Sequence, residues 1–256
     1  HAVNGEVFRK LDTEVIEEFK NANFPDHNDR MIFFWNNRNA RRKQSGSLIN
    51  WFSKFADRVG PDKVCLIMHT DPKDPNGQDL EVILSDHGIA DGRIVISRNK
   101  MPAEGLSLMY NMADCTINIS DAEGFGLATL ESLSCGTPII VNMTGGLQEQ
   151  VTDGEEWFGI GLEPCSKALI GSQTVPYIYE DRLSEEQVVG ALERFYNLSQ
   201  EERDAMGEKG MAHVQTNYNF EDFTTRWIEL ADDIVERLGS WDTRKGYKAW
   251  ELKEAM

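Results

Sequence analysis

Short apolar segments alternate with amphipathic segments over the first 150 residues of the chain. Unbroken apolar runs predict strands, whereas apolar residues spaced three and four apart predict helices. The predicted strands cover residues 31–35, 64–68, 93–96, 116–119 and 138–141, and the predicted helices cover 47–59, 79–87, 107–112 and 125–134. Strands that are apolar on both sides and alternate with helices are typical of a parallel sheet covered on both faces. The pattern therefore predicts an α/β domain with a doubly wound, Rossmann-like parallel sheet.

The pattern changes after Asp153. Residues 155–175 show no clear period and contain several Gly and Pro residues, so we expect an irregular excursion there, followed by a short strand at 176–179. Extra C-terminal helices are predicted at residues 184–198, 199–216 and 220–238. Two of them begin with a capping box, formed by Ser184 with Gln187 and by Ser199 with Glu202.

These elements suggest three parts along the chain. Residues 1–30 are expected to be a hinge-like N-terminal segment, and residues 31–238 the sheet-containing domain. Residues 239–256 are expected to be a C-terminal helical tail, because Trp241 and Trp250 lie at a helix-like spacing. The 256 residues suit one large domain with an appended element.

The charge of the chain restricts its partners. Lys and Arg number 26 against 43 Asp and Glu, which gives a formal net charge of −17. A protein that neutralises nucleic-acid phosphates needs basic surface, and so does one that binds membranes through polybasic segments. We therefore expect neither kind of partner. An anionic small ligand stays open, because a few cations and helix N-terminal amides can hold a phosphate on an acidic protein.

The cysteines and apolar runs indicate a compartment. Cys65, Cys115, Cys135 and Cys165 form no C-x-x-C pair, so we interpret them as buried small hydrophobic residues in a reducing cytosol. No apolar run approaches the roughly 18 residues that span a bilayer, and no signal peptide is visible. We predict a cytoplasmic protein without a transmembrane segment, whose membrane association, where it occurs, depends on parts outside this chain. No metal site is predicted.

A loop rich in glycine follows the predicted strand at 116–119 and precedes a helix. Gly124 and Gly126 would let the backbone approach a phosphate, and the helix N-terminus would offer it unpaired N–H groups. Glu123 in this loop and Glu131 on the helix could accept hydrogen bonds from sugar or ribose hydroxyls. From the spacing alone, a loop carboxylate and a solvated helix glutamate are favoured over a binding role for the two residues.

Two further segments follow predicted strands. Residues 38–43 contain four cations, Arg38, Arg41, Arg42 and Lys43, which could neutralise a diphosphate or could form a solvated basic loop. Residues 142–149 contain Gly145 and Gly146, which in isolation indicate only a turn. None of His27, His69, His87 and His213 lies in a recognisable catalytic motif.

Taken together, residues 93–154 resemble the C-terminal, donor-binding domain of retaining GT-B glycosyltransferases, the large group 1 family that includes glycogen and sucrose synthases. The matching residues are Glu123, Gly124, Phe125, Gly126, Glu131, Cys135, Gly136, Thr137, Pro138, Gly145, Gly146, Asp153 and Gly154. Residues 106–114 are similar to the helix that leads into this region, and residues 3–8 to the segment that joins the two domains of the family.

The resemblance implies a role for each matching residue. Arg38 and Lys43 would bind the diphosphate of a UDP-, GDP- or ADP-sugar, which is a substrate rather than a cofactor. The amides of Phe125, Gly126 and Leu127, beside Gly124, would hold the phosphates or the hexose. Glu123 would bind hydroxyls of the donor sugar, and Glu131 those of the ribose. The base would lie near Arg98, Asn99 and Met101. The expected chemistry stabilises charge on the leaving diphosphate without a metal.

The chain also departs from the family pattern. Asn36 and Asn37 precede Arg38 where the family commonly has Gly-Arg, so Arg41 and Arg42 compete with Lys43 for the pairing role. The acceptor-binding N-terminal domain of the family is missing, and with it the contact to a glycan, lipid or protein acceptor. We therefore expect the isolated chain to bind nucleotide sugar but to turn it over weakly or not at all.

Two other functions stay open. A non-catalytic nucleotide-sugar-binding or interaction module would share the same motifs as a transferase domain. A nicotinamide-dependent oxidoreductase is disfavoured, because no Gly-x-Gly-x-x-Gly follows the first predicted strand with an acidic residue about 20 positions later.

Overall fold

The computed structural model describes residues 1–246 of the chain. Its helices are α1 (Thr13–Asn23), η1 (Pro25–His27), η2 (Arg41–Lys43), α2 (Ser45–Val59), α3 (Leu80–Asp86), α4 (Ala103–Met112), α5 (Leu127–Ser134), α6 (Leu147–Val151), α7 (Glu185–Tyr196), α8 (Gln200–Asn217) and α9 (Phe220–Leu238). Its strands are β1 (Met31–Asn36), β2 (Val64–His69), β3 (Ile94–Ser97), β4 (Cys115–Asn118), β5 (Ile139–Asn142), β6 (Gly159–Leu162), β7 (Ser166–Ile170) and β8 (Ile178–Arg182).

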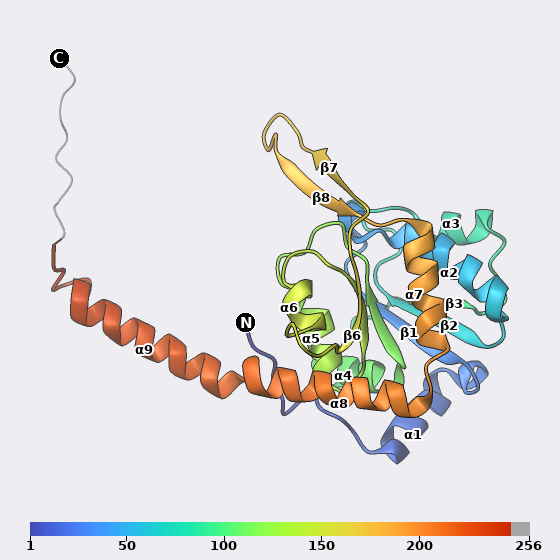
Figure 1. Cartoon of the computed structure of the whole chain (residues 1–256), viewed down its shortest axis with the longest axis horizontal. Coiled ribbons are helices and arrows are strands. Elements are labelled where there is room, and N and C mark those ends of the chain that lie inside the picture. The colour runs from blue at the N-terminus through green and yellow to red at the C-terminus, as the bar shows by residue number, and fades with distance from the viewer. Residues whose placement is uncertain (247–256) are drawn as a thin grey trace.

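Six strands form one parallel sheet in the order β3-β2-β1-β4-β5-β6, with helices on both faces. Strand β1 lies in the middle and sends side chains alternately into two cores. Phe33 packs against Phe52 and Phe195 on the face covered by α2 and α7, with ring centroids 5.5 and 5.9 Å apart. Ile32 and Phe34 contribute to the opposite core with α4 and α5. The predicted doubly wound, Rossmann-like sheet with extra C-terminal helices is confirmed (Figure 1).

The segment before β1 contains a helix that the sequence pattern did not reveal. Within residues 1–30, α1 packs with Ile16 and Phe19 against the same core as α4. The chain before α1 is held by side chains of the domain, since Ser107 Oγ donates to Val7 O at 2.8 Å and Ser134 Oγ donates to Phe8 O at 2.6 Å. The helix was missed because few of its positions are apolar, namely Val15, Ile16, Phe19 and Ala22.

The expected irregular excursion at residues 155–175 is wrong in two places. Strand β6 extends the parallel sheet beside β5, and β7 pairs with β8 as an antiparallel hairpin. The short strand predicted at 176–179 begins at Ile178 and continues to Arg182. Gly159 and Gly161 conceal β6 in the sequence pattern, but a Cβ at Gly159 would overlap the carbonyl oxygen of Ile139, so close packing explains the glycine.

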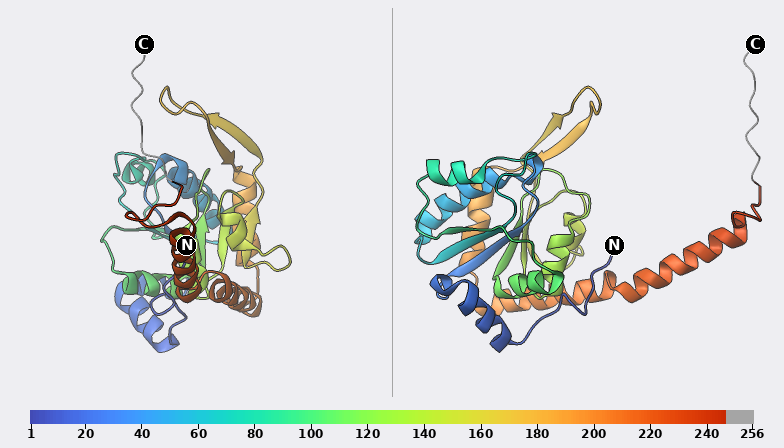
Figure 2. Two further views of the ribbon diagram at one scale, coloured as in Figure 1. Left: turned by 90° about the vertical axis from the view of Figure 1, so that its left-hand side faces the viewer. Right: turned by 180° about the vertical axis from the view of Figure 1, so that it is seen from behind.

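The last helices leave the body of the domain. Helix α8 still contributes Val214 to the core, whereas α9 has no buried residue and extends away from the sheet (Figure 2). Within the described residues no helix follows residue 239, and turns and bends lie at 241–243 and 245–246; the rest of the expected helical tail, with Trp250, lies outside the described residues. Within residues 1–246, no helix combines the length and apolar character that crossing a bilayer requires.

Three cysteines are buried as expected, but Cys165 is exposed at the start of the hairpin. Its position in the segment between β6 and β7 explains the difference, because the chain leaves the core after Leu162.

Both predicted capping boxes are present, and the one on α7 supports the core through Phe195 and its neighbours. The Ser184 side chain accepts from Gln187 N at 3.3 Å, while Ser184 N donates back to Gln187 Oε1 at 3.0 Å. Replacing Ser184 with alanine should lower the free energy of unfolding by about 1 kcal/mol, because a helix N-terminal amide loses its acceptor. Urea unfolding measures this, and Ser184→Thr, which keeps the acceptor, should unfold close to wild type. Equal loss in both variants would contradict the capping role.

Candidate functional site

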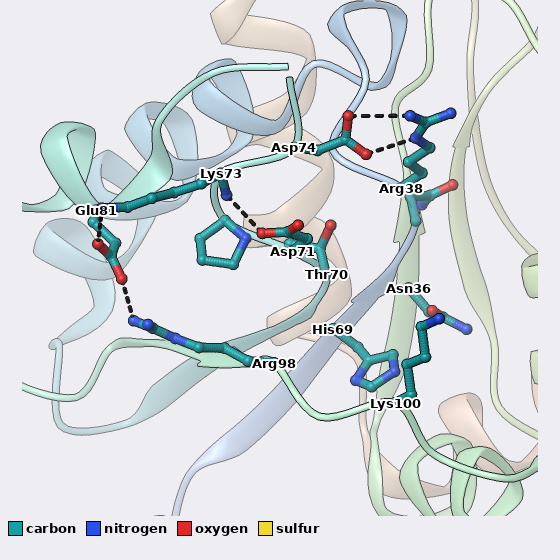
Figure 3. Close-up of a pocket in the computed structure, with 12 residues that line it drawn as sticks. Asn36, Arg38, His69, Thr70, Asp71, Lys73, Asp74, Glu81, Arg98 and Lys100 are labelled. Carbon is teal, nitrogen blue, oxygen red and sulfur yellow. Dashed lines mark hydrogen bonds and ion pairs between the residues drawn. The ribbon is translucent and has the colours of Figure 1, made fainter. Parts of the chain in front are cut away.

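A cleft of about 670 Å³ lies at the carboxyl ends of β1, β2 and β3 (Figure 3). In open parallel sheets, ligands bind at this edge. Its charged lining consists of Arg38, Asp71, Lys73, Asp74, Glu81, Arg98 and Lys100. Four cations against three carboxylates make the cleft locally positive in a chain whose net charge is −17. The cleft therefore suits an anionic ligand better than the rest of the surface does.

Arg38 lies at this cleft and is held by an acidic neighbour. Its Nε is 2.6 Å from Asp74 Oδ2 and its Nη2 is 3.2 Å from Asp74 Oδ1. The guanidinium, together with the Asn76 amide, holds the pKa of Asp74 well below its usual value. The Arg38 side chain is 63 % exposed, so a ligand can reach its remaining N–H groups. The pair orients the guanidinium before any ligand arrives.

Lys43 and Glu123 form a buried ion pair between η2 and the loop after β4. Lys43 Nζ donates to Glu123 Oε2, and the two side chains are only 9 % and 10 % exposed. Burial lowers the pKa of Lys43, although Glu123 offsets part of the effect. Burial alone would raise the pKa of Glu123, but the hydrogen bond and charge of Lys43 bring that pKa below its usual value. A bound phosphate or hydroxyl would interact strongly with this ion pair, because it lies inside the protein.

The structure also separates Lys43 from its two neighbouring arginines. Arg41 forms a bidentate pair with Glu180, with Nη1 3.0 Å from Oε2. Arg42 donates to Ala122 O at 2.5 Å and lies 3.6 Å from Glu123. Arg41 and Arg42 thus fasten η2 to neighbouring segments, and Lys43 is the cation that directly meets the loop glutamate.

The loop that carries Glu123 rests on the second glycine-rich loop. A Cβ at Gly145, whose φ is +51°, would overlap the carbonyl oxygen of Glu123. A Cβ at Gly146 would lie 2.7 Å from Phe125 O, and Gly146 N donates to Gly124 O at 3.2 Å. The Gly-Gly turn is therefore required by close packing, a role that its sequence did not reveal.

Helix α5 begins directly after this loop, with Gly126 at φ +89°. In the part of the chain described, the amides of Phe125, Gly126 and Leu127 donate no hydrogen bond. Unpaired amides at a helix N-terminus, with the positive end of the helix dipole, form a suitable position for an anion. The role in donor binding that the family resemblance implies for these three residues stays a prediction.

Glu131 lies behind the wall of the cleft. Its Oε2 accepts from the Tyr110 hydroxyl at 2.9 Å, and that hydroxyl accepts from Asn36 Nδ2 at 2.8 Å. Burial raises the pKa of Glu131, and the Tyr110 hydrogen bond offsets part of that increase. Because Asn36 lines the cleft, the network links Glu131 to the ligand side through two polar groups.

The predicted site residues thus fall into three groups. Arg38 and Arg98 line the cleft, Lys43 and Glu123 pair outside its lining, and Glu131 is linked to it through Tyr110 and Asn36. Asn99 and Met101 are outside the lining, and Met101 packs against the core that contains α4.

Sequence reasoning missed His69, the last residue of β2, although its place at a strand end was a usable signal. It lines the cleft, its Nδ1 is 3.0 Å from Ser97 Oγ, and burial lowers its pKa. Burial therefore favours the uncharged imidazole, so His69 adds a polar group without adding a cation. Within residues 1–246, no group of three or more His, Cys, Asp or Glu side chains is arranged to hold a metal ion.

A doubly wound parallel sheet with a cationic cleft at its carboxyl edge is the architecture of one Rossmann-like half of a GT-B protein. Comparison with known families agrees with this class. The model of the family "Glycosyl transferases group 1" matches residues 15–212, and the chain belongs to that family.

Curated relatives cover only parts of the chain. A D-inositol 3-phosphate glycosyltransferase of Acidothermus cellulolyticus is 43 % identical over 76 residues, which are 30 % of this chain and 16 % of that protein. A GDP-mannose-dependent alpha-(1-6)-phosphatidylinositol monomannoside mannosyltransferase of Mycolicibacterium smegmatis is 32 % identical over 134 residues, or 50 % of this chain and 34 % of that protein.

Solved structures share the fold over nearly the whole chain. Sucrose-phosphate synthase from Thermosynechococcus elongatus superposes with a TM-score of 0.72 at 21 % identity, covering 92 % of this chain and 52 % of that one. Anabaena HepE in complex with UDP-glucose gives a TM-score of 0.70 at 14 % identity, covering 91 % and 56 %. The chain therefore spans about half the length of these structures and still less of the curated relatives.

Proposed function

We propose that this chain is the donor-binding half of a retaining glycosyltransferase and takes a nucleotide diphospho-sugar at the carboxyl edge of its sheet. The observation that carries the proposal is the buried ion pair of Lys43 and Glu123, which adjoins the unpaired amides of Phe125, Gly126 and Leu127. A cation and amides suit a diphosphate, and a carboxylate suits sugar hydroxyls. A region outside this chain would complete the acceptor site.

The chemistry follows from the charges that develop in the reaction. Cleavage of the bond between the anomeric carbon and the phosphate oxygen leaves negative charge on the nucleoside diphosphate. Lys43, Arg38 and the α5 amides would stabilise that charge from fixed positions, which lowers the barrier without reorganisation. Glu123 would accept a hydrogen bond from a hydroxyl of the donor sugar.

The nucleoside would occupy the cleft between β1 and β3. Arg98 and Asn36 both line that cleft. Ribose hydroxyls bound there would contact Asn36, which is linked by hydrogen bonds through Tyr110 to Glu131. The names of the relatives support a nucleotide-sugar donor, because they include a GDP-mannose-dependent enzyme and a UDP-glucose complex. They do not favour one base.

Calorimetric titration with UDP-, GDP- and ADP-sugars tests the proposal. At least one should bind, and Arg38→Ala should weaken that binding about 10- to 100-fold, because a hydrogen bond to a charged group contributes about 1.5–3 kcal/mol. Arg58→Ala is the matched control, since Arg58 is similarly exposed and pairs with Glu193 away from the cleft. Absence of binding by all three sugars would refute the proposal, and equal weakening in both variants would refute the site.

The affinity for the donor should fall at alkaline pH before an ordinary lysine loses its charge. Burial lowers the pKa of Lys43 below 10.5, so its ammonium deprotonates early as pH rises and a positive charge is lost from the diphosphate site. Dissociation constants measured from neutral pH to pH 10.5 should show this decline. Lys43→Arg should bind more weakly at neutral pH but without the alkaline decline, because a guanidinium keeps its proton. The same decline in Lys43→Arg would assign it to another group.

A further inference from the structure

The antiparallel hairpin of β7 and β8 projects from the domain beyond the carboxyl edge of the sheet (Figures 1 and 2). Residues 168–179, which include its tip, contain no charged side chain, although 27 % of the whole chain is charged. Their exposed side chains are tyrosines, aliphatic residues and small hydroxyl-bearing residues. Such a surface is unusual for this acidic protein and calls for a neutral partner.

The root of the hairpin is fastened to the elements that form the candidate donor site. Asp181 N donates to Asp121 O at 2.7 Å, and Asn142 Nδ2 donates to Asp181 O at 2.8 Å, so β8 is joined to the ends of β4 and β5. Arg182 Nη1 lies 2.8 Å from Asp121 Oδ2, and Glu180 holds Arg41 of η2. The Glu180 side chain is only 2 % exposed, so its carboxylate lies inside the protein at the root of the hairpin. The hairpin therefore keeps a defined position relative to Lys43 and Glu123.

One face of the hairpin lies on the side of the donor loop. Tyr179 pairs with Leu169 across the hairpin and lies two positions before Asp181 on β8, so these side chains share a face. Continued over Tyr177, which directly precedes β8, the same two-residue period extends this face toward the tip of the hairpin. Asp181 Oδ2 on that face accepts from Thr144 Oγ1 at 2.8 Å. Thr144 directly precedes the Gly-Gly turn that packs against residues 123–125. The face that starts at Asp181 thus continues outward from the loop expected to hold the donor sugar.

We propose that this face, formed by Leu169, Tyr177 and Tyr179, binds sugar rings of a neutral glycan acceptor. The inference rests on the proposed donor-binding function, because only then must an acceptor approach the loop at residues 123–126. Tyr177 is 73 % exposed, Tyr179 62 % and Leu169 56 %, which leaves their apolar surfaces open to the C–H face of a sugar ring. The tyrosine hydroxyls can exchange hydrogen bonds with sugar hydroxyls at the ring edge.

The charge distribution favours a glycan over a bilayer. Membrane-surface segments that bind anionic lipids carry clusters of Lys and Arg, whereas Lys167 is the only cation on β7 and is paired with Asp181 at 3.3 Å. With a net charge of −17, the rest of the chain would be repelled by an anionic leaflet. An uncharged ligand with many hydroxyl groups needs no cluster of cations and is not repelled by the acidic chain.

Titration of the 256-residue chain with two neutral probes, α-1,6-mannotriose and maltotriose, tests the inference. Chemical shifts followed by NMR should show saturable binding of at least one trisaccharide, with the shifts confined to the hairpin and the adjoining loop. Tyr177→Ala and Tyr179→Ala should each raise the dissociation constant about 2- to 10-fold, in line with the contribution of one aromatic contact. Tyr177→Phe and Tyr179→Phe, which keep the ring, should retain most of the affinity. Trp241→Ala is the control for loss of an exposed aromatic elsewhere, since Trp241 is 83 % exposed.

Nucleotide-sugar binding is measured on the same samples, so the two proposals fail separately. The tyrosine variants should bind the donor as wild type does. If wild type binds a nucleotide sugar but neither trisaccharide shifts a resonance up to its solubility limit, the hairpin proposal is wrong and the donor proposal stands. If the double variant Tyr177→Ala with Tyr179→Ala still binds the trisaccharide as wild type does, the hairpin proposal is likewise wrong. Binding to phosphatidylcholine vesicles that is lost in this double variant, without trisaccharide binding, would assign the face to a bilayer instead.

Discussion

Replacing Lys43 with methionine should lower the free energy of unfolding by about 3 kcal/mol, because removing one member of a buried ion pair leaves the other charge without its partner. Glu123 is only 10 % exposed, so water cannot replace the lost ammonium. Arg42 compensates in part at best, since it lies 3.6 Å away and its side chain is 42 % exposed. The same change should abolish measurable donor binding. Urea unfolding and calorimetric titration measure the two effects.

A second substitution separates stability from binding. In Lys43→Met with Glu123→Leu, neither charge of the pair remains, so most of the lost stability should return while donor binding stays absent. The matched surface control is Lys54→Met, because Lys54 pairs with Glu185 where the side chains are 45 % and 34 % exposed. That variant should lose less than about 1 kcal/mol. If Lys43→Met and Lys54→Met unfold at the same urea concentration, the buried pair does not stabilise the fold.

The second large effect is expected from Gly145→Ala. A methyl group there would overlap the carbonyl oxygen of Glu123, and the backbone of both loops leaves no flexible side chain that could move aside. Overpacking of this kind costs about 1–3 kcal/mol, and the left-handed φ of +51° adds about 1–2 kcal/mol for a non-glycine residue. Because Glu123 must shift, donor affinity should fall at least about tenfold. Urea unfolding and titration of the same sample measure both results.

Gly154→Ala isolates the backbone part of this effect. Gly154 also has a positive φ, +98°, but nothing lies within 4 Å of a Cβ at that position. The variant should lose about 1–2 kcal/mol of stability and bind the donor as wild type does. Gly124→Ala, which has neither a positive φ nor a close neighbour, should be nearly neutral for stability. Similar losses of affinity in Gly145→Ala and Gly154→Ala would show that the packing of the two loops does not position Glu123.

The central sheet could be predicted from the sequence because its strands are apolar on both faces. Phe33 and Phe34 point to opposite cores, so β1 is a continuous apolar run that no surface element would carry. Strand β6 was missed because it lacks such a continuous apolar run. Gly159 and Gly161 give it little hydrophobic signal, and its place in the sheet depends on close approach to β5, which only the assembled structure shows.

The sequence could indicate candidate residues for the site, but not the hydrogen-bond and ion-pair partners of those residues. The sequence located Lys43 and Glu123 after two strands, yet three cations at residues 41–43 competed for one role. Glu180, 139 residues after Arg41, forms an ion pair with that arginine, whereas Lys43 contacts Glu123. Likewise, the link from Glu131 to the cleft needs the hydroxyl of Tyr110, which sequence spacing cannot place. The partners of these side chains depend on contacts between segments far apart in the sequence, which a local sequence pattern does not contain.

The exposed thiol of Cys165 at the base of the hairpin can carry a fluorescent label. Burial raises the pKa values of Cys65 and Cys135 to about 12 and that of Cys115 well above its usual value, so these thiols stay protonated and shielded. Cys165 is the one cysteine exposed to solvent within residues 1–246. A maleimide dye would therefore label the folded chain at a single place, three residues before Ala168, without any engineered mutation. Fluorescence anisotropy of the dye would then report on the motion of the β7–β8 hairpin while ligands are added.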